Sequence, residues 1–212
     1  MKRNKRINIA ELLEQHIVNN GKEYFIVLLM FIIGIFAGVL FVNNMQNDQN
    51  MQVTSYLSNF IEKFKGTENL NSAEILKNSI LQNVMLVCIL WFFGTTVIGL
   101  PVVFGIVLYR GFCLGYTISA TIMVLGLSKG IAFILISLLL QNIIFIPAIL
   151  AVAVSGFKLY KSIIKDRRKD NIKLEILRHT IFSIVMLVVL MLSSVIEVFI
   201  STNILKGVIK YF

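Results

Sequence analysis

Residues 80–127 decide the fold: they read ILQNVMLVCILWFFGTTVIGLPVVFGIVLYRGFCLGYTISATIMVLGL, and Arg110 is the single charged residue among them. An α-helix needs about 20 apolar residues to cross a hydrocarbon core of about 30 Å. Because each residue adds about 1.5 Å, the stretch is long enough for two crossings. The turn between the crossings lies either at residues 99–101, since proline ends a helix, or near residues 110–111, since a charge prefers the interface.

The composition excludes a water-soluble enzyme. Hydrophobic residues make up 57% of the chain and charged residues 15%, whereas soluble domains have about 45–50% and about 25%. The mean hydropathy is +0.84. Two prolines and long apolar runs favour helices over a transmembrane barrel, whose strands alternate in polarity over about 10 residues. We therefore expect an all-α, polytopic membrane protein.

Five membrane spans in a single domain are predicted, at residues 24–42, 80–100, 102–127, 131–157 and 180–202. The first apolar run exceeds the core of a typical signal peptide and follows a long polar head, so we expect an uncleaved anchor. The polar segments are the head (1–23), an outer loop (43–79), a basic inner loop (158–178) and a tail (203–212).

The distribution of Lys and Arg predicts the orientation. The head, the turn between spans two and three and the loop 158–178 together hold fourteen of these residues, and the opposite side holds six. The amino terminus is therefore expected in the cytoplasm and the carboxyl terminus outside. The net charge of +9 is explained mostly by this topology, with some attraction to the anionic lipid bilayer. Nucleic-acid binding is not expected.

Two of the polar segments carry apolar faces at helical spacing. The face in the head predicts an amphipathic helix on the inner membrane surface. The face in the outer loop predicts a second helix at the outer interface, in a loop large enough to dock a partner. The residues of the first face are Ile9, Leu12, Leu13, His16 and Ile17, and those of the second are Tyr56, Leu57, Phe60, Ile61 and Phe64.

Small residues recur at helix-packing spacing within the spans. Gly34 and Gly38 form a GxxxG motif in span one, and Gly111 and Gly115 form another near span three. Glycines four residues apart let two helix backbones approach closely, where lipid supplies no hydrophobic drive. Packing within one chain is favoured over a dimer, and a homo-oligomer is left open.

Glu197 and Arg110 are the charges that lie well inside the apolar runs. Such groups are costly in a bilayer and face a protein interior or a partner. Pairing or snorkelling to the interface is favoured, ahead of a partner contact and of an ion path. Interhelical hydrogen bonds are expected from the amides that begin spans two and four, and Pro147 in span four is a further candidate for partner or helix contacts. These amides are Gln82, Asn83, Gln141 and Asn142.

No catalytic or metal-binding motif is present in the sequence. The nearest approach to a serine elbow is AVSG at residues 153–156, which lacks the first glycine, and His179 is not expected to act as a base for Ser155. Cys88 and Cys113 show no metal-ligand spacing. We therefore expect no enzyme activity, no cofactor and no metal. A transporter would need a separate ATPase, because no Walker A motif occurs.

Four stretches resemble stage II sporulation protein M of endospore-forming Firmicutes, and the resemblance extends over essentially the full length. They are QNVMLVCILWFFG (82–94), YRGFCLG (109–115), QNIIFIPA (141–148) and VIEVFIST (195–202). Broader relatives often carry a His and a Glu near the start of span four, where this chain has Gln141 and Phe145. That departure favours the sporulation branch and weakens a transport role.

The resemblance implies a membrane scaffold for engulfment, in the mother-cell membrane at the sporulation septum. Its expected partners are two outward-facing wall hydrolases: stage II sporulation protein P, an amidase and endopeptidase, and stage II sporulation protein D, a lytic transglycosylase. Holding both on one anchor would raise their effective concentration at the septal wall. The alternative is a permease-like transporter subunit that works with a separate ATPase.

Overall fold

The computed structural model describes residues 17–65, 72–96, 98–165 and 169–201, and within these ranges it contains helices and no strand. The predicted head helix falls largely outside the described residues, as does the tail. Five helices are long and apolar enough to cross a membrane, which confirms an all-α fold with five spans. They are α2 (Gly21–Asn43), α4 (Ser72–Gly94), α5 (Leu100–Leu125), α7 (Leu140–Lys165) and α8 (Lys169–Ile196).

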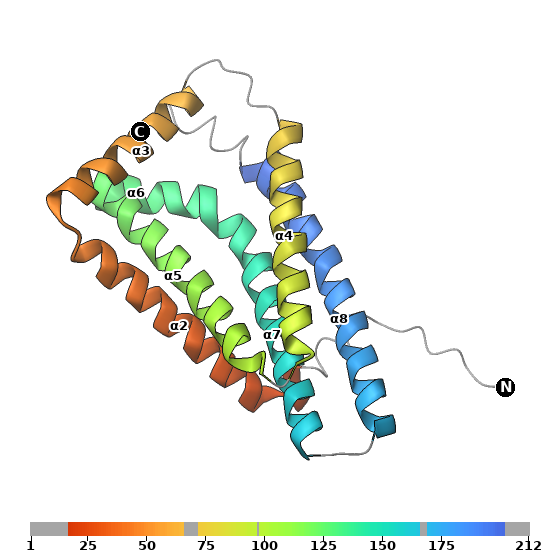
Figure 1. Cartoon of the computed structure of the whole chain (residues 1–212). Helices are drawn as coiled ribbons and strands as arrows, with labels where there is room; N and C mark the ends of the chain where they lie inside the picture. Colours follow the sequence, from red (N-terminus) through yellow and green to blue (C-terminus); the bar gives the residue numbers. More distant parts are fainter. Residues whose placement is uncertain (1–16, 66–71, 97, 166–168, 202–212) are drawn as a thin grey trace.

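Shorter elements gather at one end of the bundle, here called the α3 end. These are α3 (Asn47–Lys65), α6 (Leu127–Ile134) and two π-helical turns, η1 (Leu135–Leu139) and η2 (Glu197–Ser201). The carboxyl-terminal ends of α4 and α7 and the amino-terminal ends of α5 and α8 lie at the opposite end, the α7–α8 end (Figure 1). In the same view α2 and α5 lean together, away from α4 and α8.

The turn between the second and third spanning helices takes the proline alternative. Helix α4 ends at Gly94, and α5 begins at Leu100 with Pro101 in its first turn, where the missing backbone N–H of proline costs nothing. Arg110 consequently lies inside α5 rather than in a turn, which corrects its place in the charge count. Without it the count becomes thirteen against six, so the expected orientation, which the structure does not test, keeps its basis.

The residues of the predicted fourth span fall into three consecutive segments. Gly126 separates α5 from α6 with a φ of 78°, a backbone conformation that L side chains rarely adopt. Helix α6 then runs across the α3 end, and the chain bends through η1 into α7 (Figure 1). Helix α7 therefore starts later than the apolar run, and its last turns extend to Lys165.

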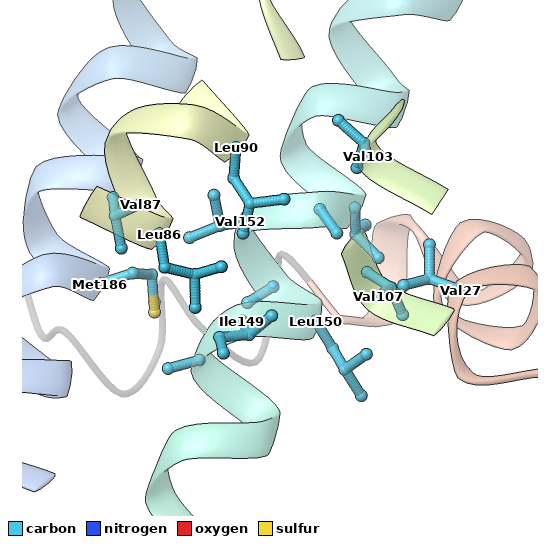
Figure 2. Packing of buried hydrophobic residues seen from close by; sticks show 14 of the residues in the cluster. Val27, Leu86, Val87, Leu90, Val103, Val107, Ile149, Leu150, Val152 and Met186 are labelled. Atoms are coloured by element: carbon cyan, nitrogen blue, oxygen red, sulfur yellow. The ribbon is translucent and has the colours of Figure 1, made fainter. Parts of the chain in front are cut away.

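Helix α7 is the centre of the bundle. Every residue from 148 to 157 is buried, and side chains of α4 and α8 approach it from one side and those of α5 and α2 from the other (Figure 2). A helix that is apolar on all faces packs inside a bundle. The segment alternates small alanines and valines, AILAVAVSG, so that neighbours on every side come close.

Part of the apolar face of helix α3 packs against the rest of the bundle. Leu57 and Ile61 pack on Phe133 of α6, which anchors the loop that follows α2. Tyr56, in contrast, is 74% exposed, and Phe60 lies at the edge of the exposed face. The side chain of Phe64 lies outside the described residues. The predicted interfacial face is thus divided between internal packing and an exposed surface.

Candidate functional site

A polar pocket of about 260 Å³ lies among α4, α5, α7 and η2, in the half of the bundle nearer the α3 end. Four of the residues singled out as candidates in the sequence line this pocket, from three separate parts of the chain: Gln82, Asn83, Arg110 and Glu197. The rest of its lining is Ile75, Asn78, Ser79 and Phe145. The two π-helical turns, η1 and η2, contact each other in this part of the molecule, and such turns are frequent at functional sites.

A chain of hydrogen bonds joins α4 to α8 along one wall of the pocket. The Ser79 hydroxyl donates to Oε2 of Glu197 at 2.7 Å, and the oxygens of Ser79 and Ser194 lie 3.0 Å apart. Asn83 donates from Nδ2 to Oγ of Ser194 at 2.7 Å. The Ser194 hydroxyl also lies 3.3 Å from the carbonyl oxygen of Leu190, to which it donates. The chain of contacts therefore runs from Asn83 through Ser194 and Ser79 to Glu197.

Asn83 makes the interhelical bond that its position predicted. Its Nδ2 also donates to the backbone carbonyl of Leu190 at 3.3 Å, and its side chain is buried between α4 and α8. Asn142, by contrast, donates within its own chain segment, to the carbonyl of Leu138 at 2.8 Å. Gln82 is exposed on α4 and faces the pocket. The side chain of Gln141 lies outside the described residues.

Arg110 forms the opposite wall of the pocket, on α5. Its guanidinium lies over the ring of Phe145, 5.3 Å from the centroid, a cation–π arrangement that favours a partly desolvated cation. Among the described residues no carboxylate forms an ion pair with Arg110. Arg110 and Glu197 thus line the same pocket. The cation of Arg110 lies against an aromatic ring, and the carboxylate of Glu197 accepts a hydrogen bond from Ser79.

The two GxxxG motifs face each other, which the sequence did not indicate. A Cβ atom added to Gly34 would collide with the carbonyl oxygen of Leu108, and one added to Gly115 would collide with that of Ile35. Gly38 and Gly111 meet carbonyl oxygens of Phe112 and Phe31 in the same way. These four glycines, here called the glycine seam, let the parallel helices α2 and α5 touch backbone to backbone, as expected for small residues in a bilayer.

In a comparison with protein families, the family model described as Stage II sporulation protein M matches residues 27–202. The matched segment begins inside α2 and extends just past η2. The chain belongs to the stage II sporulation protein M family. The resemblance seen in the sequence is therefore confirmed. Neither the curated proteins nor the solved structures compared give a match.

Family membership and the five spanning helices make the chain a multi-pass membrane protein of a sporulation family, and members of the stage II sporulation protein M family are generally non-catalytic. All residues that line the polar pocket lie within the matched residues, as do the four glycines of the glycine seam. Within the described ranges no three His, Cys, Asp or Glu side chains lie close enough to hold a metal ion.

One buried contact in this family member joins two residues that were not expected to act as a base and a nucleophile. His179 of α8 places its Nδ1 2.9 Å from Oγ of Ser155 on α7. Nε2 of His179 is buried and makes no hydrogen bond within the described part of the chain. A Cβ on Gly94 would lie 2.8 Å from that nitrogen. The small residues Gly94 and Gly156, which allow α4 and α7 to meet here, were the signal that could have located the contact.

The serine–histidine contact joins α7 to α8, and its buried surroundings differ from those of a catalytic dyad. His179 and Ser155 are 2% and 7% exposed, and the Cα atom of Gly94 lies only 3.0 Å from where a Cβ of Gly156 would be. That packing leaves no room for a substrate beside the hydroxyl, and a catalytic triad would need a third group to orient the imidazole. The pair therefore belongs to the helix packing of α4, α7 and α8.

Proposed function

We propose that this chain is a non-catalytic membrane scaffold that anchors a peptidoglycan-degrading complex during engulfment of the forespore. The observation that carries the proposal is membership of the stage II sporulation protein M family over residues 27–202. The partners that the family suggests are the two wall hydrolases, stage II sporulation proteins P and D. The location that follows is the mother-cell membrane at the sporulation septum.

The packing of the bundle supports a scaffold. Helix α2 is held to α5 by backbone contact, and α4 is held to α8 by hydrogen bonds. A rigid frame keeps two bound partners at a fixed separation, so each raises the effective concentration of the other at the wall. The buried side chains of Asn83, Ser155, His179 and Ser194 form hydrogen bonds between helices, which is what an anchor needs.

The exposed face of α3 is the contact surface that we propose for the hydrolases. Its inner face is occupied by α6, and its outer face presents Tyr56 and Met51, which are 74% and 71% exposed. Tyrosine and methionine are enriched in protein interfaces. In the expected orientation this face lies outside the cell membrane, in the compartment that contains the wall.

A mild-detergent pull-down of the tagged chain from sporulating cells, followed by mass spectrometry, tests the proposal. We expect the wild type to recover both hydrolases, and the double variant Met51→Ala, Tyr56→Ala to recover at least severalfold less, because interface anchors carry much of the binding energy. Phe25→Ala on α2, which removes an aromatic side chain that is 68% exposed, is the matched control and should bind normally.

The outcomes of the pull-down separate the two parts of the proposal. If the wild type recovers neither hydrolase, the scaffold itself is wrong. If the α3 variant recovers as much as the wild type, the scaffold stands and its contact surface lies elsewhere.

The polar pocket is the observation that favours a second candidate, a permease-like transporter subunit. Transporters bind substrates near the bilayer midplane, where helices are interrupted, and the pocket holds Arg110 and Glu197 close to two π-helical turns. Recovery of a cytoplasmic ATPase without hydrolases in the same pull-down would support this candidate over the scaffold.

A further inference from the structure

Arg110 is a cation without an anionic partner in the described part of the chain. It projects from the middle of a spanning helix, is partly buried, and lies over the ring of Phe145. A charged side chain at such depth is costly and is normally matched by an opposite charge. The pocket beside it thus has a positively charged wall that an anionic group would neutralise.

The pocket also offers hydrogen-bond donors to such a group. Asn78 and Gln82 lie four residues apart on α4, so their amides occupy the same face of the helix, and both are exposed and line the pocket with Arg110. Glu197 lines it too, bound by Ser79. Its carboxylate disfavours a doubly charged anion and favours a singly charged one that carries its own hydroxyl or ammonium donor, as the head group of a phosphodiester lipid does.

An apolar groove continues from this pocket. A small void lined by Arg110 and Phe145 also touches Leu114, Asn142 and Ile146. The same three residues line a groove of about 380 Å³ between α5 and the α6–α7 bend. The other residues of the groove are Ile118, Ile134, Leu138, Ile143 and Pro147. A polar cavity and an apolar groove therefore meet at the Arg110–Phe145 contact.

We propose that these features form a phospholipid site, with the phosphodiester on Arg110, the polar head group toward Asn78, Gln82 and Glu197, and an acyl chain in the groove. The charge of the pocket selects the phosphate and the groove selects the tail, so neither part alone reproduces the binding. The site is independent of the scaffold proposal, because its residues belong to α4, α5, α6, α7 and the two π-helical turns, and none lies on the exposed α3 face.

Native mass spectrometry of the purified full-length chain in detergent tests the proposal by titration with dioleoylphosphatidylglycerol. Two comparison compounds separate the parts of the ligand: dioleoylglycerol has the same tails without the phosphate, and glycerophosphoglycerol is the singly charged head group without the tails. We expect the phospholipid to bind about tenfold more tightly than either, because dioleoylglycerol lacks the charge-assisted hydrogen bond and glycerophosphoglycerol lacks the buried acyl chain.

The variants test the assigned residues. Arg110→Gln should weaken phospholipid binding by about tenfold, whereas Arg110→Lys should retain part of the affinity because it keeps the charge. Ile143→Trp, at an exposed position of the groove, should weaken binding of the phospholipid and leave binding of glycerophosphoglycerol unaffected. Lys129→Gln, which removes an exposed cation of α6 outside the pocket, is the matched control and should bind as the wild type does.

Three results would overturn the proposal. Unchanged affinity in Arg110→Gln would show that Arg110 is not part of the site. Equal binding of dioleoylglycerol would show that the phosphate is not recognised, and equal binding of glycerophosphoglycerol would show that the tail is not bound. If Arg110→Gln does not fold, the double variant Asn78→Ala, Gln82→Ala replaces it, with a severalfold loss expected and unchanged affinity as the contradicting result.

Discussion

Two pairs of spanning helices in this bundle are joined by opposite means. Helices α2 and α5 touch through the glycine seam, where the backbones themselves are in contact and the neighbouring side chains are apolar. Helices α4 and α8 are joined by polar side chains: Asn83, Ser79 and Glu197 at one end, and Trp91, which donates to Thr180 at 2.9 Å, at the other.

The difference teaches which kind of change each pair tolerates. Backbone contact depends on shape alone, so an added methyl group has no way to fit without moving a helix. A hydrogen-bonded pair depends on the chemistry of its side chains, and membrane hydrogen bonds contribute modestly because the separated helices find other partners. We therefore expect small additions to the first pair to cost more than deletions from the second.

The largest effect is expected from Gly38→Ala, because the new Cβ would collide with the carbonyl oxygen of Phe112. Overpacking costs about 1–3 kcal/mol in well-packed interiors, and a backbone obstacle places this variant at the upper end. The apparent melting temperature in one detergent should fall by several degrees. Gly105→Ala is the control on α5, since a Cβ there meets nothing within 4 Å, and it should be neutral or stabilise by up to about 1 kcal/mol. Equal behaviour of the two variants would contradict the seam.

A smaller loss is expected from Asn83→Leu, which removes the buried amide between α4 and α8 while keeping its approximate volume. The lost bonds to Ser194 and to the carbonyl of Leu190 are worth about 0.6–1.7 kcal/mol by the measured range for membrane proteins. The same melting assay measures it. A loss larger than that of Gly38→Ala would reverse the comparison between the two pairs.

Substitutions at Glu197 distinguish an internal fastener from a partner contact. Glu197→Gln can still accept the hydrogen bond from Ser79 and should change stability by less than about 0.5 kcal/mol, whereas Glu197→Ala should lose about 0.6 kcal/mol. Both variants should retain the hydrolases in the pull-down if the residue serves only to join α4 and α8. Loss of hydrolases in both variants, with stability unchanged, would show a direct partner contact.

The smallest effect is expected from Lys161→Ala at the α7–α8 end. Lys161 donates to Oε1 of Glu23 at 2.7 Å, but its side chain is 49% exposed, and solvent screens such pairs to about 0.2–1 kcal/mol. The difference from the wild type should shrink as salt is added. A loss that is independent of salt would indicate that contact of the Lys161 stem with the Phe157 ring, rather than its charge, carries the effect.

The sequence by itself determined the helical class and the five spans, and it singled out the charged residues inside them as candidates, because apolar length and the cost of a buried charge are local properties. It also marked both GxxxG motifs and the family. The position of the turn between α4 and α5 follows the preference of proline for the start of a helix. The sequence left this position open because Arg110 offered a competing position for the turn. The structure decided it by placing Arg110 inside α5.

Only the tertiary structure decided which of these residues meet. Gly34 with Leu108, Ser79 with Glu197 and Ser155 with His179 are far apart in the chain, and no periodicity indicates which helix faces which. The exposed and buried sides of α3 likewise depended on Phe133 of α6 being beneath Ile61. The physical reason is that a spanning helix is stable in lipid with almost any face inward, so its neighbours are chosen by shape and hydrogen bonding across the whole bundle rather than by its own sequence.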